Sequence, residues 1–173
     1  MNTPHKGLSY FAAMRSADGR LIDLQELHFE HLADNLVPME GFNALLSYAF
    51  KQVAVPPNWY VSIFSGDYTP DDTVTAATLP GLATEITAYT PGTRPVFTPG
   101  AVSGGQVSNA AALAEFTFTT QQTVRLIGLS SASAKGSTAG VLLSVARLAT
   151  PKTYDVGSVM SVFAAPTMQP ITP

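Results

Sequence analysis

The spacing of apolar and polar residues changes along the chain from a helical period to a strict alternation. In the first part, apolar and histidine residues recur three and four positions apart, which is typical of an amphipathic helix. These residues are Leu24, Leu27, His28, His31 and Leu32. Asp23 is a suitable N-cap, and Glu26 three residues later completes a capping-box pair. We therefore predict a helix that begins at Asp23 and ends at Leu36-Val37-Pro38.

A second stretch with helical spacing runs from Glu40 to Lys51. Its apolar residues form one stripe, made by Phe42, Leu45, Leu46, Ala49 and Phe50. A stripe this wide requires a partner surface. We expect residues 7–14 to be extended. Residues 1–55 together are predicted to form an N-terminal arm with one or two helices.

After Pro57 the apolar residues alternate with polar ones, which is typical of β-strands. The predicted strands cover residues 59–64, 85–89, 94–97, 114–119, 124–129, 141–146 and 158–163. The segment 94–97 is bounded by prolines, as edge strands often are, and residues 114, 116 and 118 are expected to face the core. We predict a surface loop over residues 67–82, a turn at Thr150-Pro151-Lys152 and a bend at Val156-Gly157.

Short strands separated by frequent turns predict the fold class. It is mainly β: an antiparallel β-sandwich or jelly roll over residues 56–173, with a partly helical N-terminal arm. A parallel α/β fold would need helical crossovers between the strands, and residues 56–173 contain no helical pattern.

Composition narrows the class of protein. Only 12% of the 173 residues are charged, about half of what is usual in a soluble protein. Such a surface suits a protein that is packed against neighbours. The net charge is −3, and no two Lys or Arg residues are adjacent, which argues against a nucleic-acid partner. The sequence has no cysteine, no apolar run of membrane-spanning length and no signal-peptide-like start, so we expect no membrane partner and synthesis in the cytoplasm.

Two groups of residues could bind a metal ion. His28 and His31 lie beside Glu26 and Glu30, but the string ELHFEH matches no zinc-protease motif, and we favour a surface or interface role. Asp67, Asp71 and Asp72 could supply oxygen ligands for Ca²⁺; we favour turn capping around Pro70. We therefore predict no metal site.

Three further patterns resemble functional motifs only in part. Residues 128–132 (GLSSA) resemble a nucleophile elbow, but the final glycine is missing and no histidine follows. Residues 135–138 (KGST) have the order of a phosphate loop reversed and are expected to form a flexible turn. Trp59, Tyr60 and Phe64 could stack on a carbohydrate, although packing in the core is favoured. We predict no catalytic residue, no cofactor and no enzymatic activity.

Several segments together resemble a family of small virion proteins of tailed phages. They are NWYVSIFSGDYTPDDTVTAAT (58–78), EITAY (85–89), RPVFTPGAVSGGQVSN (94–109), AEFTFT (114–119) and the closing segment 128–162, preceded by VPMEGFNALLSYAFK (37–51). The resemblance covers roughly residues 23–165, and its motifs are packing and turn residues. It implies a jelly-roll-like virion protein that serves as capsid cement or decoration, or as a fibre or adaptor piece of the tail.

The main hypothesis is a cement protein on the capsid surface that stabilises the head by bridging subunits of the major capsid protein. It is expected to be a homo-oligomer, with a trimer as the working guess. The predicted interface consists of Leu24, Leu27, Phe42, Leu46 and Phe50. The alternative is a tail-fibre, adaptor or receptor-binding module. An enzyme such as a depolymerase is the third possibility, but Glu85 and Glu115 are the only glutamates after residue 56 and make no credible catalytic pair.

Overall fold

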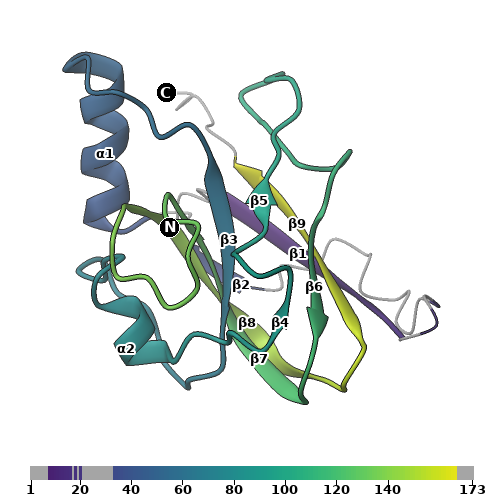
Figure 1. Ribbon diagram of the computed structural model, residues 1–173. Coiled ribbons are helices and arrows are strands. Elements are labelled where there is room, and N and C mark those ends of the chain that lie inside the picture. The colour runs from purple at the N-terminus through teal and green to yellow at the C-terminus, as the bar shows by residue number, and fades with distance from the viewer. Residues whose placement is uncertain (1–7, 17, 19, 21–32, 167–173) are drawn as a thin grey trace, which may run out of the picture.

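Two antiparallel β-sheets pack face to face in the computed structural model (Figure 1), which describes residues 8–16, 18, 20 and 33–166. A four-stranded sheet has the order β1-β9-β6-β4, and a five-stranded sheet has the order β2-β8-β7-β3-β5. The strands are β1 (Leu8–Arg15), β2 (Ala33–Leu36), β3 (Trp59–Phe64), β4 (Tyr89–Thr90), β5 (Val96–Phe97), β6 (Ala114–Phe118), β7 (Gln122–Ser130), β8 (Leu142–Tyr154) and β9 (Val159–Pro166). The helices are α1 (Met39–Phe50) and α2 (Leu79–Ala83). The prediction of an antiparallel β-sandwich is confirmed, while the jelly-roll variant stays a prediction.

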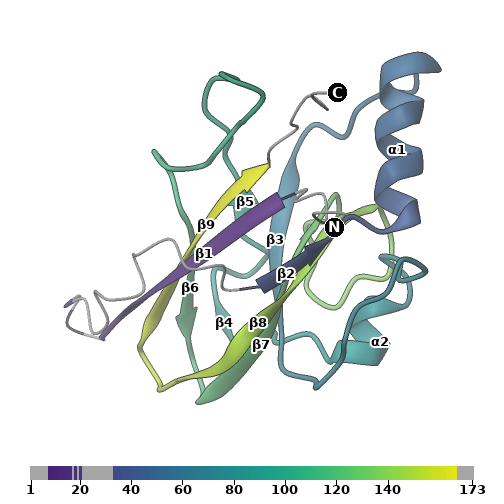
Figure 2. The same ribbon diagram turned by 180° about the vertical axis from the view of Figure 1, so that it is seen from behind.

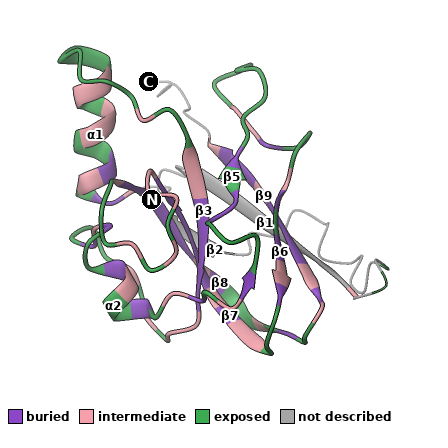
Figure 3. Cartoon of the chain, in the orientation of Figure 1, coloured by how far each residue is buried: buried purple, intermediate pink, exposed green. Residues whose placement is uncertain are grey.

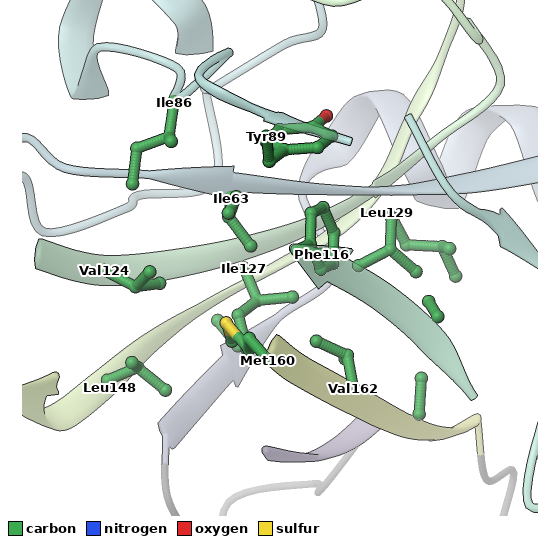
Figure 4. Close-up of a cluster of buried hydrophobic side chains, with 14 of the residues drawn as sticks. Ile63, Ile86, Tyr89, Phe116, Val124, Ile127, Leu129, Leu148, Met160 and Val162 are labelled. Atoms are coloured by element: carbon green, nitrogen blue, oxygen red, sulfur yellow. The ribbon is translucent and has the colours of Figure 1, made fainter. Parts of the chain in front are cut away.

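The main core lies between the two sheets, where the alternating apolar residues of facing strands meet (Figure 4). In β6, Ala114, Phe116 and Phe118 are buried, as predicted, and Glu115 between them is exposed. Two aromatic pairs fill the centre of this layer. Tyr89 meets Phe116 edge-on at 4.8 Å between ring centroids, and Phe118 stacks on Tyr154, also at 4.8 Å.

A second, smaller core covers the outer face of the five-stranded sheet. Phe64, Leu126, Leu142 and Val145 point away from the main core and pack beneath residues of the segment 74–83 that includes α2. The fit is close at Gly66, because a Cβ atom there would lie 2.5 Å from the backbone oxygen of Ala83. Both faces of this sheet are therefore covered, which explains why β3 is apolar on both sides.

The N-terminal residues are part of the sandwich. Residues 8–15 are extended, as predicted, and form β1, which pairs with β9 over its full length. β2 pairs with residues 145–148 of β8 in the other sheet. Strands β1 and β2 lie side by side at one edge of the sandwich (Figure 2). Strands β1 and β2 are therefore members of the two sheets although they precede residue 56, and the division of the chain into an arm and a domain stays a prediction.

The helix predicted from Asp23 to Leu36 is wrong at its C-terminal end, because Ala33–Leu36 is strand β2. The open edge of β8 offers this segment a ladder of backbone hydrogen bonds. These bonds favour a strand over the helix that the local spacing of apolar residues predicts. Residues 21–32 of that prediction lie outside the described part of the chain.

A predicted turn, a predicted loop and a predicted strand differ in detail from the structure. Pro151 lies inside β8 rather than in a turn, beside a register shift between Val124 and Leu126 of β7, where a residue without an N–H group is tolerated. The chain reverses instead around Gly157, at the predicted bend. The predicted loop 67–82 contains the start of α2, and the strand predicted over 85–89 is reduced to a bridge between Glu85 and Phe64 followed by β4. β5 is an edge strand, as predicted.

Candidate interaction surface

Helix α1 is seated on the sandwich through its first turn. A Cβ atom at Gly41 would lie 2.4 Å from the backbone oxygen of Leu143, so only glycine allows the helix to approach β8 this closely. Gly41 is the buried residue of the helix. Further along, Leu45 is half-buried and packs against the main core.

The side chain of Glu40 fastens the same turn to two other segments. One oxygen of its carboxylate, Oε2, accepts a hydrogen bond from the backbone N–H of Ala76 at 2.8 Å and another from that of Leu142 at 2.7 Å. The backbone N–H of Met39 donates a hydrogen bond to the backbone oxygen of Asp72 at 2.9 Å. A carboxylate in the first turn is also favoured by the helix dipole. These contacts hold the start of α1 against the beginning of β8 and the loop before α2.

The outer face of α1 is apolar and open to solvent (Figure 3). Phe42 is 52% exposed, Leu46 55% and Phe50 80%. Met39 at the start of the helix and Val53 just beyond its end are about half exposed, and Val55 follows them. The four exposed apolar residues of the helix, Met39, Phe42, Leu46 and Phe50, are called the α1 face, and grouped apolar exposure of this kind marks an interaction site.

The predicted interface residues divide into two groups. Phe42, Leu46 and Phe50 lie together on the α1 face, and the helix itself is observed one residue earlier than predicted. Leu24 and Leu27 lie outside the described residues, as do His28 and His31 with Glu26 and Glu30. The interface assignment itself therefore stays a prediction.

A buried ion pair between Arg94 and Glu85 is absent from the sequence-based predictions. Both side chains are almost fully buried, at 3% and 2% exposure, and are 2.5 Å apart. The guanidinium donates five hydrogen bonds. Two go to the carboxylate of Glu85, one to the hydroxyl of Ser130, and one each to the backbone oxygens of Ala132 and Ser137. The geometry matches the five N–H donors of an arginine, so none of them is available to a ligand.

The loop between β7 and β8 is tied down by the same cluster. The N–H of Gly136 donates to Glu85, and the ammonium of Lys135 donates to the backbone oxygens of Thr87 and Tyr89 while it lies 3.8 Å from the centre of the Tyr89 ring. Burial lowers the pKa of Lys135, and the nearby charge of Glu85 opposes this effect. The KGST segment is thus an anchored loop whose lysine is used inside the chain.

The GLSSA motif has a structural role. Residues 128–130 lie inside strand β7, and the Ser130 hydroxyl is buried against Arg94 at 3.1 Å, unlike a nucleophile at an exposed turn. A cavity beside it, lined partly by Ser62, Arg94 and Ser137, has a volume of about 10 Å³. That is room for roughly one water molecule, which is far too small for a substrate.

Two of the three aspartates in the GDYTPDD segment, Asp67 and Asp71, have structural partners. Asp71 accepts hydrogen bonds from the N–H and the hydroxyl of Thr73, as a turn cap does, and these bonds lower its pKa. Asp67 pairs with Arg147, whose hydrogen bond lowers the pKa of that carboxyl. No group of three or more metal-binding side chains occurs within the described ranges.

Two of the three aromatic residues considered for carbohydrate stacking pack within the protein. Phe64 is buried in the smaller core, and Trp59 is half-buried against the main one.

Among the described residues, neither helix has the length and the apolar composition of a membrane span.

The buried Arg94–Glu85 pair is bonded within the protein's own loops, and the exposed apolar residues of α1 form the candidate interaction surface. The model of one protein family matches residues 41–169, which is 129 of the 173 residues; its description is "Podophage GP4 fiber I protein gp80". The chain belongs to this family and is a structural protein of a phage virion. No curated protein matches the sequence.

Proposed function

We propose that this protein is a non-enzymatic subunit of a fibre on the phage tail. The observation that carries the proposal is the family match, which spans α1 and the sandwich strands from β3 onward and whose description names a fibre protein. This match favours the tail-fibre interpretation, the alternative of the sequence analysis, over a capsid cement.

The structure supports a role in assembly. Burial of one large apolar side chain contributes about 1.5–3 kcal/mol, so the α1 face represents a substantial free energy that the isolated chain leaves unused. The buried charged groups of Arg94 and Glu85 bind each other and the loop between β7 and β8. Contacts with other fibre subunits would cover the α1 face, and a contact with the tail or with the major capsid protein would anchor the fibre.

The experiment is to count and locate the protein in purified phage particles. Quantitative mass spectrometry gives its amount relative to the major capsid protein, and gold-labelled antibody against the chain gives its position. A fibre subunit should be present at a small fraction of the capsid protein, with the label at the tail.

Antibody against the major capsid protein is the matched control and should label the whole head. If this protein instead matched the capsid protein in abundance and its label covered the head, the fibre assignment would be wrong and the cement hypothesis would replace it.

A further inference from the structure

The cavity beside Ser130 is lined by both polar and apolar residues. Its polar residues are Ser62, Arg94, Ser130 and Ser137, and the first three are at most 3% exposed. They come from β3, from the segment before β5, from β7 and from the loop between β7 and β8. The apolar remainder of the lining belongs to β3, β8 and the segment 74–83 that includes α2. The cavity therefore lies where the outer face of the five-stranded sheet meets the segments that cover it.

The hydroxyl of Ser130 uses only part of its hydrogen-bonding capacity. Its oxygen accepts a hydrogen bond from Nη1 of Arg94 at 3.1 Å, so its own hydrogen must be donated to another acceptor. No atom of the described residues accepts that hydrogen. A buried hydroxyl hydrogen without an acceptor is destabilising, and native proteins leave few such groups. Ser130 is therefore a donor in need of a partner.

The hydroxyl of Ser62 is satisfied only weakly. It donates to the backbone oxygen of Gly128 at 3.4 Å, whereas a hydroxyl donor usually lies about 2.5–3.0 Å from its acceptor. Its oxygen receives no hydrogen bond from another described residue. Ser62 can therefore accept a hydrogen bond at the cavity where Ser130 can donate one.

The two serines lie on the same face of the sheet, on neighbouring strands. Ser62 is paired with Gly128, and Ser130 lies two residues further along β7. Diagonal neighbours of this kind are about 7–8 Å apart, and no hydrogen bond joins the two hydroxyls. Gly128 has no side chain to fill the space beside them, since a Cβ atom there would lie 2.9 Å from Oγ of Ser62. The arrangement leaves room for a bridging molecule between the two hydroxyls.

The size and the charge of the cavity select a single neutral molecule. Its volume of about 10 Å³ holds one water. A cation would lie beside the guanidinium of Arg94, and an anion would find all five N–H donors of that group in use and its charge balanced by Glu85. We propose that one ordered water occupies the cavity, accepts a hydrogen bond from the hydroxyl of Ser130 and donates one to that of Ser62. Ser137 offers an oxygen for its second hydrogen, so the water has the number of partners that is typical of buried water.

The water extends the anchor of the loop to a further strand. Arg94 binds Glu85 and the loop between β7 and β8, and its bond to Ser130 continues through the water to Ser62 in β3. Hydrogen bonds through a bridging water are nearly as favourable as direct ones. The water is therefore part of the fold, and its presence does not depend on where the protein lies in the particle.

A high-resolution crystal structure of the full chain tests the site directly. Electron density for one water should lie about 2.7–3.0 Å from the hydroxyl oxygens of both Ser62 and Ser130. In crystals of the double variant Ser62→Ala, Ser130→Ala the same density should be lost, because the water then lacks the two hydroxyls that hold it.

Unfolding in urea tests whether the two hydroxyls act together. Ser62→Ala and Ser130→Ala should each raise the equilibrium constant for unfolding, since each removes one partner of the water. The double variant should raise it by less than the product of the two single effects, by about threefold or more, because the second substitution acts on a site that has already lost the water. Ser62→Ala combined with Ser161→Ala is the matched control. Ser161 is 1% exposed and lies in the other sheet, so these two effects should multiply.

Two results would overturn the inference. One is a wild-type crystal structure with no water between the two hydroxyls, or with an ion in its place. The other is a double variant whose effect equals the product of the single effects, which would mean that Ser62 and Ser130 share no partner. Circular dichroism spectra that match the wild type show that each variant retains the fold.

Discussion

Replacing Arg94 by methionine should destabilise the protein far more than any comparable change at the surface. The substitution removes five hydrogen bonds and leaves the carboxylate of Glu85, which is 2% exposed, as an uncompensated buried charge. Removing one partner of a buried ion pair costs about 3–5 kcal/mol. In a protein of this size each kcal/mol lowers the melting temperature by about 2–4 °C, so we expect a fall on the order of 10 °C.

The chain contains a matched control for this experiment. Arg147 and Asp67 form an ion pair with the same 2.5 Å separation, but their side chains are 34% and 67% exposed. Exposed pairs contribute about 0–1 kcal/mol, so Arg147→Met should shift the melting temperature by no more than a few degrees. Thermal unfolding and urea titration of both variants at pH 7 make the comparison.

A double substitution separates loss of packing from the buried charge. Arg94→Met combined with Glu85→Leu removes the isolated carboxylate and should regain about 2 kcal/mol relative to Arg94→Met alone. If Arg94→Met cost no more than Arg147→Met, or if the double variant were less stable than the single one, the reasoning from an uncompensated buried charge would be refuted.

Three smaller changes test other contacts, each by thermal unfolding. Gly41→Ala should cost about 1–3 kcal/mol because its Cβ would meet the backbone of β8. Gly81→Ala, which lies in α2 with open space around it, should leave stability unchanged or raise it by up to about 1 kcal/mol; a loss equal to that of Gly41→Ala would contradict the close seat of α1. Tyr154→Phe should leave stability unchanged or raise it by up to about 1–3 kcal/mol, because this buried hydroxyl has no hydrogen-bond partner among the described residues; a clear loss would reveal one. Asp71→Asn should lower stability at pH 7, and the difference should disappear as the pH falls below the lowered pKa of Asp71, since a carboxylate with a lowered pKa contributes stability only while ionised; a difference that persisted at pH 2 would point to another cause.

Local patterns predicted the elements whose environment repeats along the chain. The alternation in β6 placed Phe116 and Phe118 in the core because a strand packed on one side must alternate. The apolar stripe predicted helix α1, but its residues divide in the structure: Leu45 packs against the main core, whereas Phe42, Leu46 and Phe50 are exposed. Both predictions depend on neighbours within about a dozen residues.

Features that depend on distant partners could not be predicted in this way. Ala33–Leu36 becomes a strand because β8, more than a hundred residues later, has a free edge. Arg94 and Glu85 are nine positions apart in a region without a regular period, and their pairing becomes evident only when the 131–140 loop folds over them. In a region with few charged residues, an arginine directly before a proline and a glutamate nine positions earlier are the signal that could have drawn attention to them.

The central claim is that this sandwich is a component of the tail fibre rather than of the head shell. A cryo-EM reconstruction of the phage particle tests it most directly, because the two sheets and the protruding helix α1 give the chain a recognisable outline. Our account predicts that density with this outline occurs in fibres at the tail. The same density repeated over the head, with α1 lying on capsid subunits, would contradict it.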